Sequence, residues 1–106
     1  MSVNLVPAVI AVKAGKDKAG QNAIVHQVAQ ITTKCCYYNV EIVEGFVSFG
    51  GLKDIKKEAI KIFEKKAYRY LMIYSPTQFT QNEKEYREFV EELEQFYNIH
   101  VKQLRP

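Results

Sequence analysis

Four apolar segments of strand length are separated along this chain by connections long enough to hold a helix. The segments are rich in β-branched and aromatic residues and cover Leu5–Val12, Val40–Val47, Tyr68–Tyr74 and Ile99–Leu104. Antiparallel neighbours need only a short turn between them, whereas parallel neighbours need a long crossover connection. The pattern therefore predicts an α/β fold with a parallel sheet and right-handed crossovers.

Each connection contains a segment with helical periodicity. A first helix is expected over residues 22–37 and a second over Leu52–Lys66, each with apolar residues on one face. A third is expected over Glu83–Tyr97, where Asn82 and Glu85 resemble a capping box. These three helices would cover both faces of a four-stranded sheet and give a three-layer sandwich. A length of 106 residues fits one domain, 1–106.

Any ligand site is expected at one edge of this sheet. In open parallel sheets, ligands bind beyond the carboxyl ends of the strands. Those ends lead into the loops Lys13–Gln21, Phe46–Gly51 and Ser75–Asn82. A site should therefore be assembled from these three loops.

The first of these loops has the glycine spacing of a phosphate-binding loop but not its chemistry. Gly15 and Gly20 are correctly spaced, but Gln21 and Asn22 stand where the motif has lysine and serine or threonine. Without the lysine no charge reaches the phosphates, and without the hydroxyl magnesium loses a ligand. A flexible glycine loop is the preferred interpretation.

Other sites typical of α/β folds lack their residues. A phosphorylated receiver needs acidic residues after the first strand and an aspartate after the third, where this chain has Lys13 and Ser75. A dinucleotide site would need Gly-x-Gly-x-x-Gly, which is absent. We therefore expect no cofactor.

The cysteines predict neither a disulfide nor a metal site. Cys35 and Cys36 are adjacent, and neither a Cys-x-x-Cys motif nor a Cys/His metal spacing is present. We expect two reduced thiols, Cys35 packed inward and Cys36 near the surface, and no bound metal. The N-terminus has no features of a secretion signal and no apolar run is long enough to span a membrane, so a cytoplasmic protein is expected.

Residues 74–82, the loop after the third predicted strand, read Tyr-Ser-Pro-Thr-Gln-Phe-Thr-Gln-Asn. This loop resembles a loop of the serine recombinase family (resolvases, invertases and phage-type integrases). The family loop reads roughly Leu-Asp-Arg-Leu-Ser-Arg-Asn. Thr77 stands at the aspartate, Gln78 and Gln81 stand at the two arginines, and Thr80 stands at the serine. The order of the loop is similar, and its charges are missing.

The resemblance extends from residue 9 to residue 104. The family's first strand ends in Arg-Val-Ser, and its serine attacks the DNA phosphate. Lys13 and Gly15 occupy the arginine and serine positions, and Gln27 coincides with a glutamine near the family's active site. Ser48 stands where an aspartate is expected after the second strand. The resemblance implies the strand order 2-1-3-4, with the first strand central.

These replacements predict a domain without recombinase activity. Attack on a phosphodiester needs a hydroxyl nucleophile and several cations that stabilise the transition state. Gly15 has no side chain, and Gln78 and Gln81 are neutral. We therefore expect a catalytically inactive, resolvase-like domain that acts by binding protein, either a partner or a second copy, in the setting of a mobile element or prophage.

Two alternatives remain open. The first is a DNA-associated accessory to recombination, which binds duplex weakly through Lys13, Lys16, Lys18 and the lysines of the second predicted helix. The formal net charge of +3 is too small to indicate nucleic-acid binding by itself. The family continues into a dimerising helix and a DNA-binding domain, and with an end at Pro106 this chain is expected to lack both. The second alternative is an enzyme with an altered site built on Thr77, Thr80 and Gln27.

The aromatic content favours protein contact. Seven tyrosines and six phenylalanines are more than one small core needs, and such residues are enriched in interface cores. Seven of them are not all expected to face inward: Tyr37, Tyr38, Phe46, Phe49, Tyr68, Phe79 and Tyr97.

Overall fold

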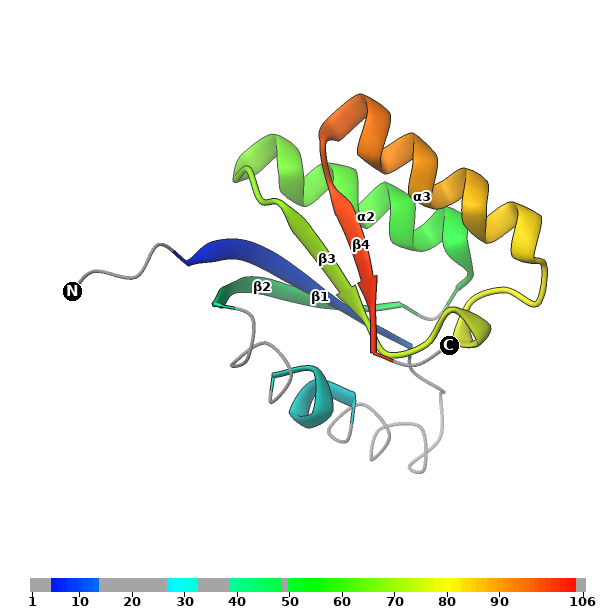
Figure 1. Ribbon diagram of the computed structural model, residues 1–106, viewed down its shortest axis with the longest axis horizontal. Coiled ribbons are helices and arrows are strands. Elements are labelled where there is room, and N and C mark those ends of the chain that lie inside the picture. The colour runs from blue at the N-terminus through cyan, green and yellow to red at the C-terminus, as the bar shows by residue number, and fades with distance from the viewer. Residues whose placement is uncertain (1–4, 14–26, 33–38, 49, 105–106) are drawn as a thin grey trace.

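The computed structural model describes residues 5–13, 27–32, 39–48 and 50–104. Within these residues four parallel strands form one sheet in the order β2-β1-β3-β4, as Figure 1 shows. The strands are β1 (Val6–Lys13), β2 (Val40–Ser48), β3 (Tyr70–Ile73) and β4 (His100–Gln103). The predicted parallel sheet, its order and its central first strand are confirmed.

Helices lie on both faces of the sheet, which confirms the predicted layers. The helices α2 (Leu52–Lys65) and α3 (Glu83–Tyr97) lie side by side on one face. Residues 27–32 are helical and lie on the opposite face (Figure 1). A short 3₁₀ helix, η1 (Pro76–Gln78), follows β3. The remainder of the predicted first helix and both cysteines fall outside the described residues.

The central strand β1 is buried on both of its faces. Val9 and Ala11 pack into the core beneath α2 and α3. Ala8, Ile10 and Val12 point the other way, into a second core that includes Ile31 of the opposite helical segment. Successive strand residues point to opposite faces, so a strand covered on both sides is apolar at every position.

The third and fourth strands are shorter than predicted. Tyr68 does not join β3 but lies buried against α2, where its hydroxyl donates a hydrogen bond to the Ala59 carbonyl oxygen over 2.7 Å. The next residue, Arg69, donates its backbone N–H to the Pro7 carbonyl at 2.9 Å. One part of the apolar segment Tyr68–Tyr74 therefore forms β3, and Tyr68 packs beneath α2.

The third helix has the predicted bounds. Its N-cap is Asn82, and it ends at Asn98, whose positive φ of 54° is the left-handed conformation that terminates helices. Phe89 and Leu93 are its buried residues, and Phe96 is exposed. None of the helices in the described part of the chain combines the length and the hydropathy that crossing a membrane would require.

Candidate functional site

The carboxyl end of β1 is held by the side chain of Gln27. The Lys13 backbone N–H donates to Gln27 Oε1 at 3.2 Å, and Gln27 Nε2 donates to the Lys13 carbonyl oxygen at 3.0 Å. The Gln27 side chain is buried, so its amide connects the strand end to the helical segment beside it. This residue, predicted at the site by resemblance, therefore has a structural role in the fold.

The carboxyl end of β2 forms a second internally bonded group. The Ser48 hydroxyl is buried, lies 3.2 Å from Asp54 Oδ2 and accepts a hydrogen bond from the Gly50 N–H at 3.3 Å. The Lys13 ammonium donates to the Gly50 carbonyl oxygen. A Cβ on Gly50 would lie only 3.0 Å from the Cβ of Asp54, so glycine fits this turn. Ser48 and Lys13 thus stabilise the turn that leads into α2.

The loop after β3 is stabilised by its own polar side chains. Ser75 Oγ and Thr77 Oγ1 lie 2.9 Å apart, and Gln81 Nε2 donates to the Thr77 carbonyl oxygen at 3.0 Å. The Oε1 atom of Gln78 is buried and has no hydrogen-bond partner among the described residues. Both glutamines at the family's arginine positions therefore lie in this loop, Gln81 bonded to its backbone and Gln78 turned partly inward.

Thr80 takes part in the start of α3. Asn82 Oδ1 accepts hydrogen bonds from the N–H groups of Lys84 and Glu85, at 3.0 and 3.2 Å. The Asn82 N–H donates to Thr80 Oγ1 at 3.1 Å, and the Thr80 hydroxyl donates to Glu85 Oε2 at 3.4 Å. The predicted capping box is therefore modified: Thr80 accepts the hydrogen bond from Asn82 N–H that Glu85 would otherwise accept.

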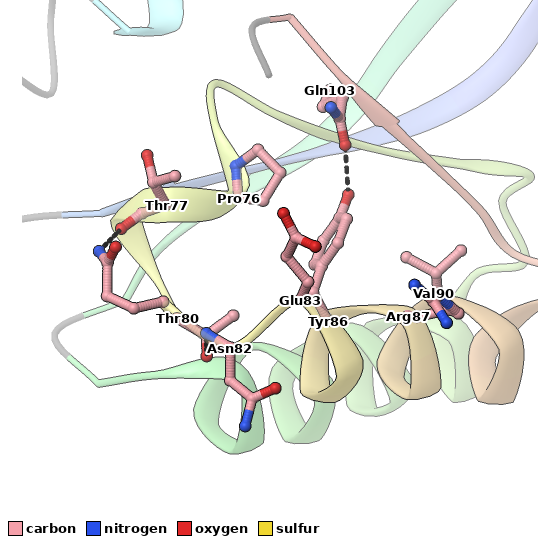
Figure 2. Close-up of a pocket in the computed structure, with 10 residues that line it drawn as sticks. Pro76, Thr77, Thr80, Asn82, Glu83, Tyr86, Arg87, Val90 and Gln103 are labelled. Carbon is pink, nitrogen blue, oxygen red and sulfur yellow. Dashed lines mark hydrogen bonds between the residues drawn. The ribbon is translucent and has the colours of Figure 1, made fainter.

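A groove of about 600 Å³ lies between η1, the first turns of α3 and the end of β4 (Figure 2). Ten of the described residues line it: Pro76, Thr77, Thr80, Gln81, Asn82, Glu83, Tyr86, Arg87, Val90 and Gln103. Glu83 and Arg87 are the charged members of this set. The α3 N–H groups of Lys84 and Glu85 already donate to Asn82, so they are not available to an anion.

Tyr86 closes one wall of the groove. Its hydroxyl donates to Gln103 Oε1 at 2.9 Å, which joins α3 to the end of β4 (Figure 2). Burial raises the pKa of Tyr86 to about 12. The hydroxyl is therefore neutral at physiological pH and is poorly suited to act as a base or nucleophile.

The groove has few groups that would stabilise a phosphoryl transition state. Such a state needs several cations directed at the developing charge. Arg87 contributes one cation, and the carboxylate of Glu83 lies on the same helix one turn away. No three His, Cys, Asp or Glu side chains gather as a metal site anywhere in the described ranges. Gly15, Lys16 and Lys18 lie outside those ranges.

Five groove residues were not identified as site residues from the sequence: Glu83, Tyr86, Arg87, Val90 and Gln103. Tyr86 and Arg87 follow Asn82 by about one turn of α3, so helical periodicity could have placed them beside the loop. Gln103 ends β4, beside the predicted site edge. Of the seven aromatic residues not all expected to face inward, Tyr68 and Phe79 are buried in the core. Phe96, which is not one of the seven, is the most exposed large hydrophobic residue among those described.

Comparisons with known proteins bear on the fold. No family model matches the sequence, and no curated protein matches it. Among the solved structures that match is the C-terminal catalytic domain of ISC1926 TnpA, an IS607-like serine recombinase, with a TM-score of 0.72 and 17% sequence identity. The match covers 95% of this chain and 70% of that one. The protein therefore has the fold of a serine recombinase catalytic domain.

Proposed function

We propose that this chain is a catalytically inactive domain with a serine recombinase fold, which acts by binding protein in the setting of a mobile element or prophage. The observation that carries the proposal is the loop after β3, where Gln78 and Gln81 stand at the arginine positions of the resembled family. A neutral amide forms weaker hydrogen bonds to phosphate than a bidentate arginine does.

The other polar side chains at this edge support the same proposal. Gln27, Ser48 and Thr80 have hydrogen-bond partners within the chain and stabilise strand ends or a helix start. Gly15 supplies no hydroxyl. These residues serve the scaffold, and a preserved scaffold remains useful as a binding surface.

The exposed lysines of α2 favour one alternative, a DNA-associated accessory to recombination. Lys53, Lys57 and Lys61 are all exposed. Lys13, on which the same alternative relied, donates its ammonium to a backbone carbonyl. The helix α2, which carries these lysines, lies on one face of the sheet (Figure 1).

An assay for covalent DNA adducts tests the loss of catalysis. Purified protein is incubated with supercoiled plasmids that carry recombination sites and is then analysed on denaturing gels. We expect neither cleavage nor a protein–DNA adduct. An adduct that disappears in Thr77→Ala or Thr80→Ala would instead identify a substitute nucleophile and overturn the proposal.

A further inference from the structure

The exposed charged side chains of the helical layer are mainly basic on α2 and mainly acidic on α3, and the exceptions are Asp54, Glu64, Lys84 and Arg87. On α2, Lys53, Lys57 and Lys61 follow one another at intervals of one turn and are all exposed. On α3, Glu88 and Glu91 are exposed. We call these residues the lysine row and the glutamate pair.

The two helices run side by side in the same direction (Figure 1). Lys56 forms an ion pair with Glu92, which fixes the level of one helix against the other. Lys53 and Glu88 border the same small hollow between them. Lys53 and Lys57 therefore lie at about the same level along the helices as the glutamate pair, and Lys61 lies further along α2.

An exposed aromatic residue lies beside these charges. One turn beyond the Lys56–Glu92 ion pair on each helix come Ile60 and Phe96. Ile60 is half-buried, whereas 74% of the Phe96 surface is exposed. Phenylalanine at such a position exposes apolar area that association would remove from water.

We infer that this face binds the same face of a second copy of the chain. A twofold axis parallel to the two helices and between them places α2 of each copy over α3 of the other. Lys53 and Lys57 of one copy then lie opposite the glutamate pair of its partner, at the same level. A twofold axis across the helices would place lysines opposite lysines, so charge selects the first arrangement.

The same axis runs between the two helices, beside Phe96. Phe96 follows Glu92 by one turn and so lies on the side of α3 that faces α2. The surface thus has an exposed apolar residue beside charges that complement themselves.

The size of the face predicts a weak dimer. Helices of 14 and 15 residues are about 21 and 22 Å long. Two of them side by side offer a partner roughly 400 Å², since neighbouring helices lie about 10 Å apart. The total buried area would fall below the standard range, so we expect dissociation constants on the order of 10–1000 µM.

Sedimentation equilibrium between about 10 µM and 1 mM, near ~150 mM salt, tests the inference. We expect the wild type to show a monomer–dimer equilibrium. The double variants Lys53→Glu/Lys57→Glu and Glu88→Lys/Glu91→Lys should each weaken it at least roughly tenfold, because opposite charges become like charges. The quadruple variant restores opposite charges at the wild-type net charge of +3 and should dimerise like the wild type.

Two single variants separate this face from the rest of the molecule. Phe96→Ser should weaken the dimer at least roughly tenfold without altering the circular dichroism spectrum, because it removes the exposed apolar side chain beside the charges. Lys102→Glu is the matched control, since Lys102 lies over the Tyr70 ring in the core on the opposite face of the sheet, and it should leave the dimer unchanged.

This inference rests on the proposed protein-binding function and names its partner. A wild type that stays monomeric over the whole range overturns it, as does a quadruple variant that fails to dimerise. Neither result would restore catalysis, so the proposed inactivity would stand on the DNA adduct assay. An active wild type in that assay would remove the proposed function while leaving the sedimentation result unaffected.

Discussion

Gln78 places a side-chain oxygen in the protein interior without a hydrogen-bond donor among the described residues. A buried acceptor without a partner loses its hydrogen bonds to water and gains none in return. Replacing it with an apolar group of similar shape removes that cost. We therefore expect Gln78, which stands at an arginine position of the resembled motif, to lower the stability of the fold.

We predict that Gln78→Met raises the free energy of unfolding by up to about 1 kcal/mol in urea titrations monitored by circular dichroism. Gln81→Met is the matched control, because Gln81 donates a hydrogen bond to the Thr77 carbonyl at the surface and its loss should be neutral or slightly destabilising. A clear decrease in stability for Gln78→Met would show that the oxygen has a donor in the folded protein.

The start of α3 is the element in which short-range sequence signals act together. Asn82 accepts from two backbone N–H groups, and Thr80 in turn accepts from the Asn82 N–H. Both residues line the groove, so polar groups of the loop that resembles the recombinase active-site loop stabilise the start of a helix.

We predict that Asn82→Ala lowers the free energy of unfolding by about 1 kcal/mol, the usual cost of losing an N-cap. Thr80→Ala should cost less, because its hydrogen bonds are exposed. The double variant should destabilise by less than the sum of the two, since both act on the same turn. Fully additive values in urea unfolding would contradict the arrangement in which Thr80 supports the cap.

The elements that the sequence predicted well are those with local signals. The bounds of α3 follow from Asn82 and Asn98, each of which acts within one turn of the helix. The third strand was predicted to start too early, because a largely apolar residue such as Tyr68 suits both a sheet and the space beneath a helix. Its hydrogen bond to Ala59 depends on how α2 lies over the sheet, which no local pattern contains.

In the candidate site too, some features follow from the sequence pattern, and others depend on how the elements pack. The sequence predicted a site built from three loops at the carboxyl edge, since that edge follows from parallel topology. Of these loops, Ser75–Asn82 is the one whose described residues line the groove. The contact between Tyr86 and Gln103 joins residues 17 positions apart, and it arises only once β4 lies beside β3. The hydrogen bonds of Gln27 to the end of β1 and of Ser48 to the turn before α2 were not predicted either, because the same side chains would suit a catalytic role.

At the scale of the whole molecule, the distribution of charge decides how the chain meets DNA. The net charge is only +3, and the described lysines do not form one continuous surface. Lys13 donates to the Gly50 carbonyl and Lys56 pairs with Glu92. The lysine row on α2 lies next to the glutamates of α3, which repel phosphate.

We therefore predict that duplex DNA binds this chain no more tightly than the non-specific range of roughly 10⁻⁴–10⁻⁶ M at physiological salt. The measurement is a fluorescence anisotropy titration at several salt concentrations, with duplexes of unrelated sequence compared side by side. Each phosphate contact should contribute about 0.9 to the slope of log affinity against log salt, so a shallow slope is expected. Lys53→Glu/Lys57→Glu should weaken whatever binding is present, equally for every sequence. Sub-micromolar binding that depends on sequence would instead favour the accessory role in recombination over protein binding, because the three lysines of the row and a small net charge do not supply that affinity.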